Sequence, residues 1–241
     1  MPPAAAQALA RRLNVMFAPA YLTLISIIQG VALSTLAGRI ESGSTHFTPV
    51  DWIVASTTFL FCLGVWNEYV MGLMIYAAVA SLLDAAIPFA VLAIELLLVH
   101  FVGGDPRGYL LAFALGACGG VVAAVHVALR PETRTANRPI HEALTPVRQT
   151  RFNFSIVSSI LLLGAALAYD HVGLRQAPML VAVLVLVNVL VFVLSGVPYW
   201  QRVVMLAQLA PTVPEPAMKR SELTKQAKKR LGPGKYTQRL R

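Results

Sequence analysis

Six apolar stretches, each about twenty residues long or longer, constrain the fold of this chain more than any other feature. They lie at 15–38, 52–76, 82–102, 109–129, 152–170 and 179–200. A helix of about 20 residues rises about 30 Å, which is the thickness of the hydrocarbon core of a bilayer. Because 57% of the 241 residues are hydrophobic and 13% are charged, an ordinary soluble domain is excluded. The sequence therefore predicts an all-α integral membrane protein, with a six-transmembrane-helix bundle in residues 1–206.

The positive charges are unevenly distributed between the two sides of such a bundle. If the N-terminus is cytoplasmic, seventeen of the twenty Lys and Arg residues fall in cytoplasmic segments, and the other three are Arg39, Arg107 and Arg175. Basic residues retard the translocation of short loops, so this asymmetry sets the orientation. We expect a cytoplasmic-type membrane with both termini in the cytoplasm. The segment 130–151, which contains three prolines, is expected to form a solvated cytoplasmic loop.

Residues 207–241 form a Pro-containing, basic segment that is expected to be a largely disordered cytoplasmic tail. Nine basic residues and one acid, Glu222, lie between Lys219 and Arg241, so this part carries +8 of the net charge of +9. Basic residues near anionic lipid headgroups contribute about 1 kcal/mol each. We therefore expect lipid binding by Lys219, Arg220, Lys225, Lys228, Lys229 and Arg230. An acidic protein partner is the alternative, and nucleic acid is disfavoured because Tyr236 is the one aromatic residue of the tail.

Two glutamates lie inside apolar stretches that contain no Lys or Arg. Glu68 belongs to the second stretch and Glu95 to the third. A charge at the bilayer centre costs about 2.5–3.5 kcal/mol on insertion scales. Each acid must therefore be neutral, which burial favours, or be neutralised by a bound cation. The sequence predicts a site for protons or for monovalent cations such as Na⁺ or K⁺.

Glu95 is the stronger of the two candidates because it lies deeper. It follows the expected start of the third stretch by about thirteen residues, or about 20 Å, which places it near the middle of the bilayer. The depth of Glu68 depends on whether its helix ends at Tyr76 or at Gly72. In the second case Glu68 would lie in an interfacial belt of aromatic side chains.

Three amides are expected to support the ion with their side-chain dipoles. Asn67 is adjacent to Glu68, and Gln29 and Asn188 are predicted at a depth similar to that of Glu95. Alternatively, Gln29 and Asn188 form ordinary hydrogen bonds between helices.

Small residues at four-residue spacing mark helix faces that allow close packing. Gly64 and Gly72 flank Glu68 on one face, so Glu68 is expected to face protein and not lipid. The fourth apolar stretch carries a row of small residues, namely Ala112, Gly116, Gly120 and Ala124. The first stretch carries a small, polar row, namely Thr23, Ser26, Gly30 and Ser34. These rows predict helix packing.

The sequence has no pattern for a metal, cofactor or hydrolytic site. Cys62 and Cys118 lie in apolar stretches without C-x-x-C spacing. His100 and His126 are expected at opposite membrane faces, too far apart to bind one haem iron. No HExxH, GxSxG or Walker motif occurs. We expect no cofactor, no metal and no catalytic residue. A lipid-modifying enzyme with polar groups at the cytoplasmic interface is a less favoured alternative.

Taken together, these features predict a small channel or transporter-like protein for protons or monovalent cations. Glu95 is the central group, Glu68 is second, and Asn67, Gln29 and Asn188 support them. The alternative is a non-catalytic membrane scaffold or accessory subunit, whose acids are neutral hydrogen-bond donors and whose tail binds anionic lipid or a partner. Six helices in one chain leave little room for a wide pore, which favours a homo-oligomer.

Overall fold

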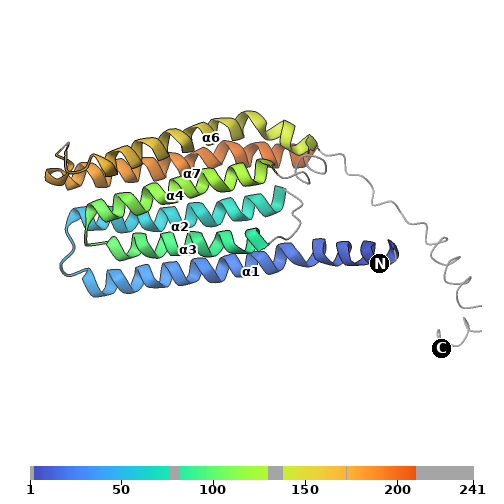
Figure 1. Ribbon diagram of the computed structural model, residues 1–241, viewed down its shortest axis with the longest axis horizontal. Coiled ribbons are helices and arrows are strands. Elements are labelled where there is room, and N and C mark those ends of the chain that lie inside the picture. Colours follow the sequence, from blue (N-terminus) through green and yellow to red (C-terminus); the bar gives the residue numbers. More distant parts are fainter. Residues whose placement is uncertain (1–2, 76–81, 130–137, 172, 210–241) are drawn as a thin grey trace, which may run out of the picture. The chain divides into compact units, whose positions relative to one another are not determined.

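A computed structural model describes residues 3–75, 82–129, 138–171 and 173–209 (Figure 1). The chain divides into two compact units, Met1–Arg202 and Val203–Arg241. The description below concerns the first unit. The expected tail was residues 207–241; residues 207–209 continue the last helix, and the residues expected to bind lipid, between Lys219 and Arg230, lie outside the described residues. The predicted boundary between bundle and tail stays a prediction.

The described residues form six α-helices and one short 3-10 helix, with no strand among them. In order, they are α1 (Pro3–Gly43), α2 (Pro49–Ile75), α3 (Leu82–Phe101), α4 (Pro106–Leu129), α6 (Arg138–Leu167), η1 (Leu174–Gln176) and α7 (Pro178–Leu209). Each of the six predicted apolar stretches overlaps one α-helix. The all-α fold class is therefore confirmed.

Five of these helices contain a segment long and apolar enough to cross a membrane. The segments are Ala18–Gly43, Pro49–Leu73, Pro106–His126, Glu142–Leu167 and Pro178–Leu206. In α3 the corresponding apolar segment is the shorter Ala86–Phe101. Large apolar side chains point outward from the bundle; Val122, Ile160 and Leu161 are each more than 60% exposed. Outward apolar surface of this kind supports a multi-pass membrane protein.

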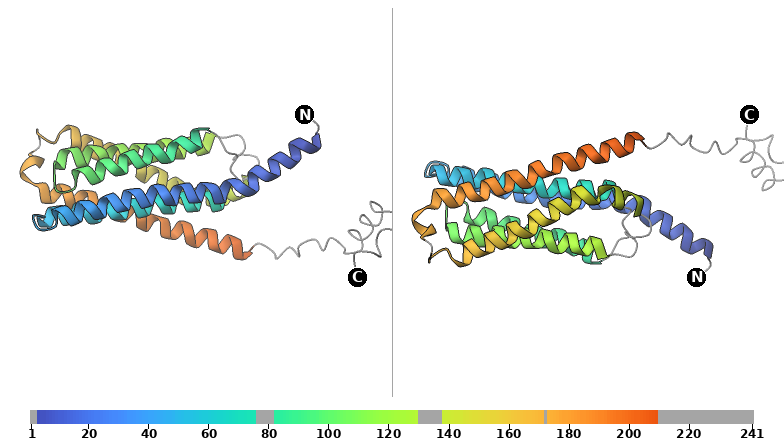
Figure 2. Two further views of the ribbon diagram at one scale, coloured as in Figure 1. Left: turned by 90° about the horizontal axis from the view of Figure 1, so that it is seen from below. Right: turned by 90° about the horizontal axis from the view of Figure 1, so that it is seen from above.

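Consecutive helices run in opposite directions along the bundle (Figures 1 and 2). One end of the bundle, here called the Gly43 end, contains the end of α1 and the start of α2. The opposite end, here called the Ile75 end, contains the end of α2 and the start of α3. Within the bundle, α1 packs against α2 and α3, and α4 packs against α3 and α6.

Capping residues start two helices at the Gly43 end. The Thr48 backbone N–H donates to Asp51 Oδ2 (2.8 Å), and the Asp51 N–H donates back to Thr48 Oγ1 (3.4 Å), which is a capping box before α2. Asp105 accepts from the backbone N–H groups of Arg107 and Gly108 at the start of α4. These side chains satisfy amides that have no partner inside the helix.

The prediction of a loop at 130–151 is wrong for residues 138–151, which are helical. Helix α6 begins at Arg138 and continues through Pro146 to Leu167. Pro139 is tolerated because it lies in the first turn, where backbone N–H groups lack helical partners in any case. Pro146 removes a single helical hydrogen bond, and neighbouring helices allow such a break inside a membrane bundle. Arg151 therefore lies within a helix of the bundle.

The rows of small residues pack along only part of their length. A Cβ built on Gly64 would lie 2.8 Å from the ring of Phe192, so α2 and α7 approach closely there. Gly116 likewise lies against Phe61 and Ile94. By contrast, Gly72 and Gly120 have no neighbouring atom within 4 Å of a built Cβ. The row on α1 is exposed at Thr23, Ser26, Gly30 and Ser34.

We expect Gly64→Ala to be less stable than Gly120→Ala by about 1–3 kcal/mol, because the added methyl overpacks the contact with Phe192. Both glycines are helical, so the gain in helix propensity is the same and cancels in the comparison. Thermal unfolding in detergent measures the difference. Equal stability of the two variants would contradict the close α2 to α7 contact.

Candidate functional site

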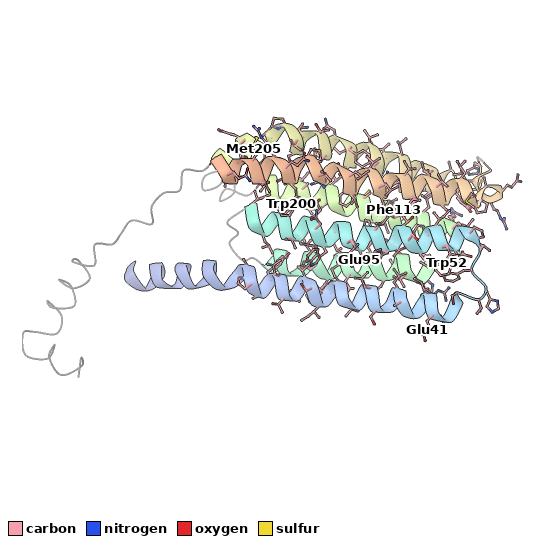
Figure 3. All side chains as sticks on the ribbon, turned by 180° about the vertical axis from the view of Figure 1, so that it is seen from behind. Glu41, Trp52, Glu95, Phe113, Trp200 and Met205 are labelled. Atoms are coloured by element: carbon pink, nitrogen blue, oxygen red, sulfur yellow. The ribbon has the colours of Figure 1, made fainter. Side chains whose placement is uncertain are left out.

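Glu95 is a carboxylic acid inside the apolar bundle. It lies on α3 thirteen residues after Leu82 and six before Phe101, or about 20 Å and 9 Å from the two helix ends. Its side chain is fully buried, with 0% exposure. Figure 3 shows it well inside the bundle, away from both ends. Glu95 is therefore buried inside the bundle, and its expected depth in the bilayer stays a prediction.

Gln29 of α1 holds the carboxyl group of Glu95. Its Nε2 donates to Glu95 Oε1 at 2.8 Å and to Oε2 at 3.1 Å. Gln29 is itself 5% exposed, and its Oε1 has no hydrogen-bond partner among the described residues. The sequence placed these two residues at one depth, and the structure brings them into contact.

Helix α2 contributes the remaining polar groups near Glu95. The buried thiol of Cys62 interacts with the Glu95 carboxyl group, and the hydroxyl of Tyr69 interacts with it electrostatically. The ring of Tyr69 packs edge-on against Tyr21 of α1, with 6.1 Å between the ring centroids. Among the described residues, no ion pair involves Glu95. The carboxyl group on α3 is therefore hydrogen-bonded by an amide of α1, and neutral polar groups of α2 lie near it.

Glu68 lies in a different environment, because Arg151 of α6 pairs with it. Arg151 Nη1 donates to Glu68 Oε2 at 3.1 Å, and Arg151 Nη2 donates to Oε1. The expectation that no cation lies near Glu68 is wrong, because Arg151 belongs to a helix and not to a loop. Helix α2 continues to Ile75, which places Glu68 about 10 Å from the helix end, so the alternative end at Gly72 is also wrong.

Helix α7 completes the surroundings of this ion pair. Arg151 Nε donates to Ser195 Oγ at 3.2 Å, and the guanidinium lies 5.7 Å from the ring centre of Phe192 and 5.5 Å from that of Tyr199. These are distances at which cation–π attraction operates. Beside it, Trp200 Nε1 donates to Asn67 Oδ1 at 3.0 Å. The cluster joins α2, α6 and α7.

A cavity of about 100 Å³ adjoins this cluster between α2 and α7. Its lining is mostly apolar and consists of Leu60, Leu63, Gly64, Asn67, Glu68, Phe192 and Val193. Glu95 does not line it. Asn188 also lies apart from Glu95, since its Nδ2 donates to Ser158 Oγ of α6. Asn188 therefore forms the interhelical hydrogen bond that was the alternative interpretation.

Comparison with known protein families, curated proteins and solved structures finds no match to this chain. Candidate functions therefore rest on the geometry of the site.

The sequence did not identify Arg151 as the partner of Glu68, nor Cys62 and Tyr69 as neighbours of Glu95. Arg151 was assigned to a loop because Pro139 and Pro146 precede it. Cys62 and Tyr69 are typical of apolar packing, and no spacing pattern separates a packing thiol from one beside a carboxyl group. The available signal was their position on α2, seven residues apart, which places them on one face of the helix.

We expect a double-mutant cycle of Glu68→Gln and Arg151→Met to give a coupling of about 1–3 kcal/mol, because Arg151→Met alone leaves a carboxylate without its partner. Stability in detergent is measured for the single and double variants. The control is the pair Arg107 and Asp170, which are about half exposed, 2.7 Å apart and expected to couple by less than about 1 kcal/mol. Equal couplings would show that Glu68 and Arg151 act as an ordinary surface pair.

Proposed function

We propose that this protein conducts or transports protons or monovalent cations across a membrane, and that Glu95 binds and releases the ion. The observation that carries the proposal is a fully buried carboxyl group held by an amide, with no cationic side chain bonded to it among the described residues. Such a group costs several kcal/mol when charged, unless an ion neutralises it. Intramembrane acids without a structural partner are typical of ion and proton sites.

The amide of Gln29 suits an acid that changes its protonation state. Its NH₂ group donates to both oxygens of the carboxylate form. When Glu95 is the neutral acid, its own O–H needs an acceptor. The Oε1 atom of Gln29, which has no partner among the described residues, supplies one after rotation of the amide. One side chain therefore serves both forms of Glu95.

The membrane arrangement in this proposal has six spans, with α3 as the third. The Ile75 end then faces the cytoplasm and the Gly43 end faces outward, because most Lys and Arg residues lie in segments at the Ile75 end. The basic tail rests on anionic lipid headgroups through residues such as Lys228 and Lys229. A homo-oligomer is compatible with this arrangement.

Glu68 has a supporting role in this proposal. Arg151 already neutralises its charge, so Glu68 does not need an ion. Its bonds tie α2 to α6, and the contacts of Arg151 with Ser195 and Phe192 extend this link to α7. Asn67 stabilises the same region through Trp200.

We expect Glu95→Gln to abolish ion flux into liposomes while the protein stays folded, because Gln keeps the shape and an acceptor oxygen for Gln29 but cannot titrate. Flux of H⁺, Na⁺ and K⁺ is measured at several pH values with purified protein. Glu41→Gln is the matched control. Glu41 is exposed at the Gly43 end, so we expect this substitution to leave ion flux unchanged.

A different outcome would favour the scaffold or accessory subunit. In that case wild-type protein carries no flux of any of the three ions, and Glu95→Gln has the stability of the wild type. Glu95 would then be a neutral hydrogen-bond donor between helices, and the search would move to partners of the tail.

A further inference from the structure

The cavity between α2 and α7 has a polar end and an apolar end. Its polar lining side chains are Asn67 and Glu68, and the rest of the lining is Leu, Gly, Phe and Val. Leu60 begins the lining eight positions before Glu68, so the cavity follows α2 for about 12 Å. Because α2 ends at Ile75, the polar end is the one nearer the Ile75 end. A lipid in the leaflet on that side has the same order, with its polar group toward the membrane surface and its chain toward the bilayer middle.

The cavity reaches the outer surface of the bundle. Leu63, which lines it, is 40% exposed, and the Glu68 side chain is 38% exposed. A cavity of about 150 Å³ holds benzene, so the cavity of about 100 Å³ holds about four non-hydrogen atoms. A polar head atom and the first carbons of a chain therefore fit inside, and the rest of the chain lies on the apolar outer surface beside Leu63.

The charge at the polar end is already balanced. Arg151 donates to both carboxylate oxygens of Glu68, so the two side chains together carry no net charge. An ammonium head would add an unpaired positive charge within the bilayer, and a carboxylate or phosphate head would meet the carboxylate of Glu68. The ion pair therefore favours a neutral head group.

A hydroxyl group matches the hydrogen-bonding capacity that remains at the polar end. A carboxylate has about four lone-pair positions, and Arg151 uses two of those of Glu68. Asn67 Oδ1 accepts from Trp200 Nε1 at 3.0 Å, whereas Asn67 Nδ2 donates to no group in the described part of the chain. Glu68 can therefore accept a hydrogen bond and Asn67 can donate one, and a single hydroxyl group supplies both partners.

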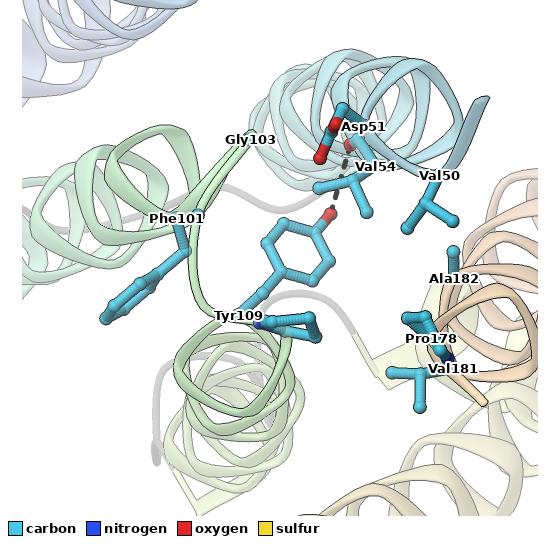
Figure 4. Close-up of a pocket in the computed structure, with 11 residues that line it drawn as sticks. Val50, Asp51, Val54, Phe101, Gly103, Tyr109, Pro178, Val181 and Ala182 are labelled. Carbon is cyan, nitrogen blue, oxygen red and sulfur yellow. Dashed lines mark hydrogen bonds between the residues drawn. The ribbon is translucent and has the colours of Figure 1, made fainter. Parts of the chain in front are cut away.

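A smaller cavity near the Gly43 end lacks these properties (Figure 4). Its volume is about 20 Å³, which is room for a single water molecule. The hydroxyl group of Tyr109, which lines it, lies 3.0 Å from Thr58 Oγ1 and donates to the Val54 carbonyl oxygen at 3.3 Å. This cavity has neither the volume for a chain nor a hydroxyl group without a partner, so it serves as an internal control.

We propose that the cavity between α2 and α7 binds a single-chain membrane lipid with a neutral hydroxyl head, such as a long-chain alcohol or a monoacylglycerol. The hydroxyl group donates to Glu68 and accepts from Asn67, and the first carbons of the chain lie between α2 and α7. Glu95 does not line this cavity. The inference therefore goes beyond the proposed function and does not depend on it.

The test uses a long-chain alcohol that carries a photoreactive diazirine near its hydroxyl group, with wild-type protein in phosphatidylcholine nanodiscs. Mass spectrometry identifies the labelled peptides, and titration gives the apparent Kd. We expect labelling of segments 60–68 and 192–193 that unlabelled monoacylglycerol competes away, and no such labelling around Tyr109. The methyl ether of the same alcohol cannot donate to Glu68, so we expect it to bind at least about fivefold more weakly. The same chain ending in an ammonium or a carboxylate group is also expected to bind more weakly than the alcohol.

Two variants test the location of the site. Val193→Phe fills the cavity and keeps both polar side chains, so we expect it to weaken binding of the alcohol by about tenfold. Val191→Phe is the matched control, because Val191 is 41% exposed on the same helix and outside the lining; we expect a change of less than about twofold. Asn67→Leu removes the donor and is expected to weaken binding by about fivefold. Thermal unfolding checks that each variant is folded, and the comparison of probes on wild-type protein needs no variant.

Several results would overturn the inference. Equal binding of the alcohol and its methyl ether would exclude recognition of the hydroxyl group, and tighter binding of the ammonium probe would exclude a neutral head. Competition by a short alcohol such as butanol, without labelling by the long-chain probe, would show a site for small alcohols and not for a lipid. Equal effects of Val191→Phe and Val193→Phe would place the labelled surface outside the cavity.

Discussion

Hydrocarbon offers no water to a polar side chain, and this constraint governs how the helices of the bundle are joined. Buried polar groups therefore gain stability from partners on another helix or on their own backbone. Gln29 and Glu95 join α1 to α3, Thr58 and Tyr109 join α2 to α4, and Asn188 and Ser158 join α7 to α6. Apolar packing alone would not specify these pairings, because the outward faces of the same helices are equally apolar.

The two intramembrane glutamates satisfy that constraint in different ways. Arg151 neutralises Glu68, and the guanidinium is in turn held by Ser195 and by two aromatic rings. Within the described residues, Glu95 is hydrogen-bonded by the amide of Gln29 and forms no ion pair. Glu68 therefore has a cationic partner, whereas the hydrogen-bond partner of Glu95 among the described residues is neutral. This difference is the physical reason why we propose Glu95, and not Glu68, as the ion-handling group.

Small residues add a second constraint, because they set how closely two neighbouring helices can approach each other. Gly64 lets α2 approach Phe192 of α7, and Gly116 lets α4 approach Phe61 and Ile94. The same spacing at Gly120 leads to no contact. A four-residue repeat of small side chains is therefore permissive for packing, and the neighbouring helix decides how much of the repeat is used.

The sequence by itself determined the all-helical class, the approximate position of each apolar helix and the place of Glu95 along its helix, because these depend on hydrophobicity along one chain and on the fixed rise of a helix. Tertiary structure decided which polar groups meet. Arg151 and Glu68 are 83 positions apart, and Gln29 and Glu95 are 66 apart. Tyr109 of α4 and Thr58 of α2, 51 positions apart, also meet only in the tertiary structure. Contacts of this kind depend on how helices rotate and pack around one another, and helix periodicity within a single segment carries no information about the rotation of its neighbours.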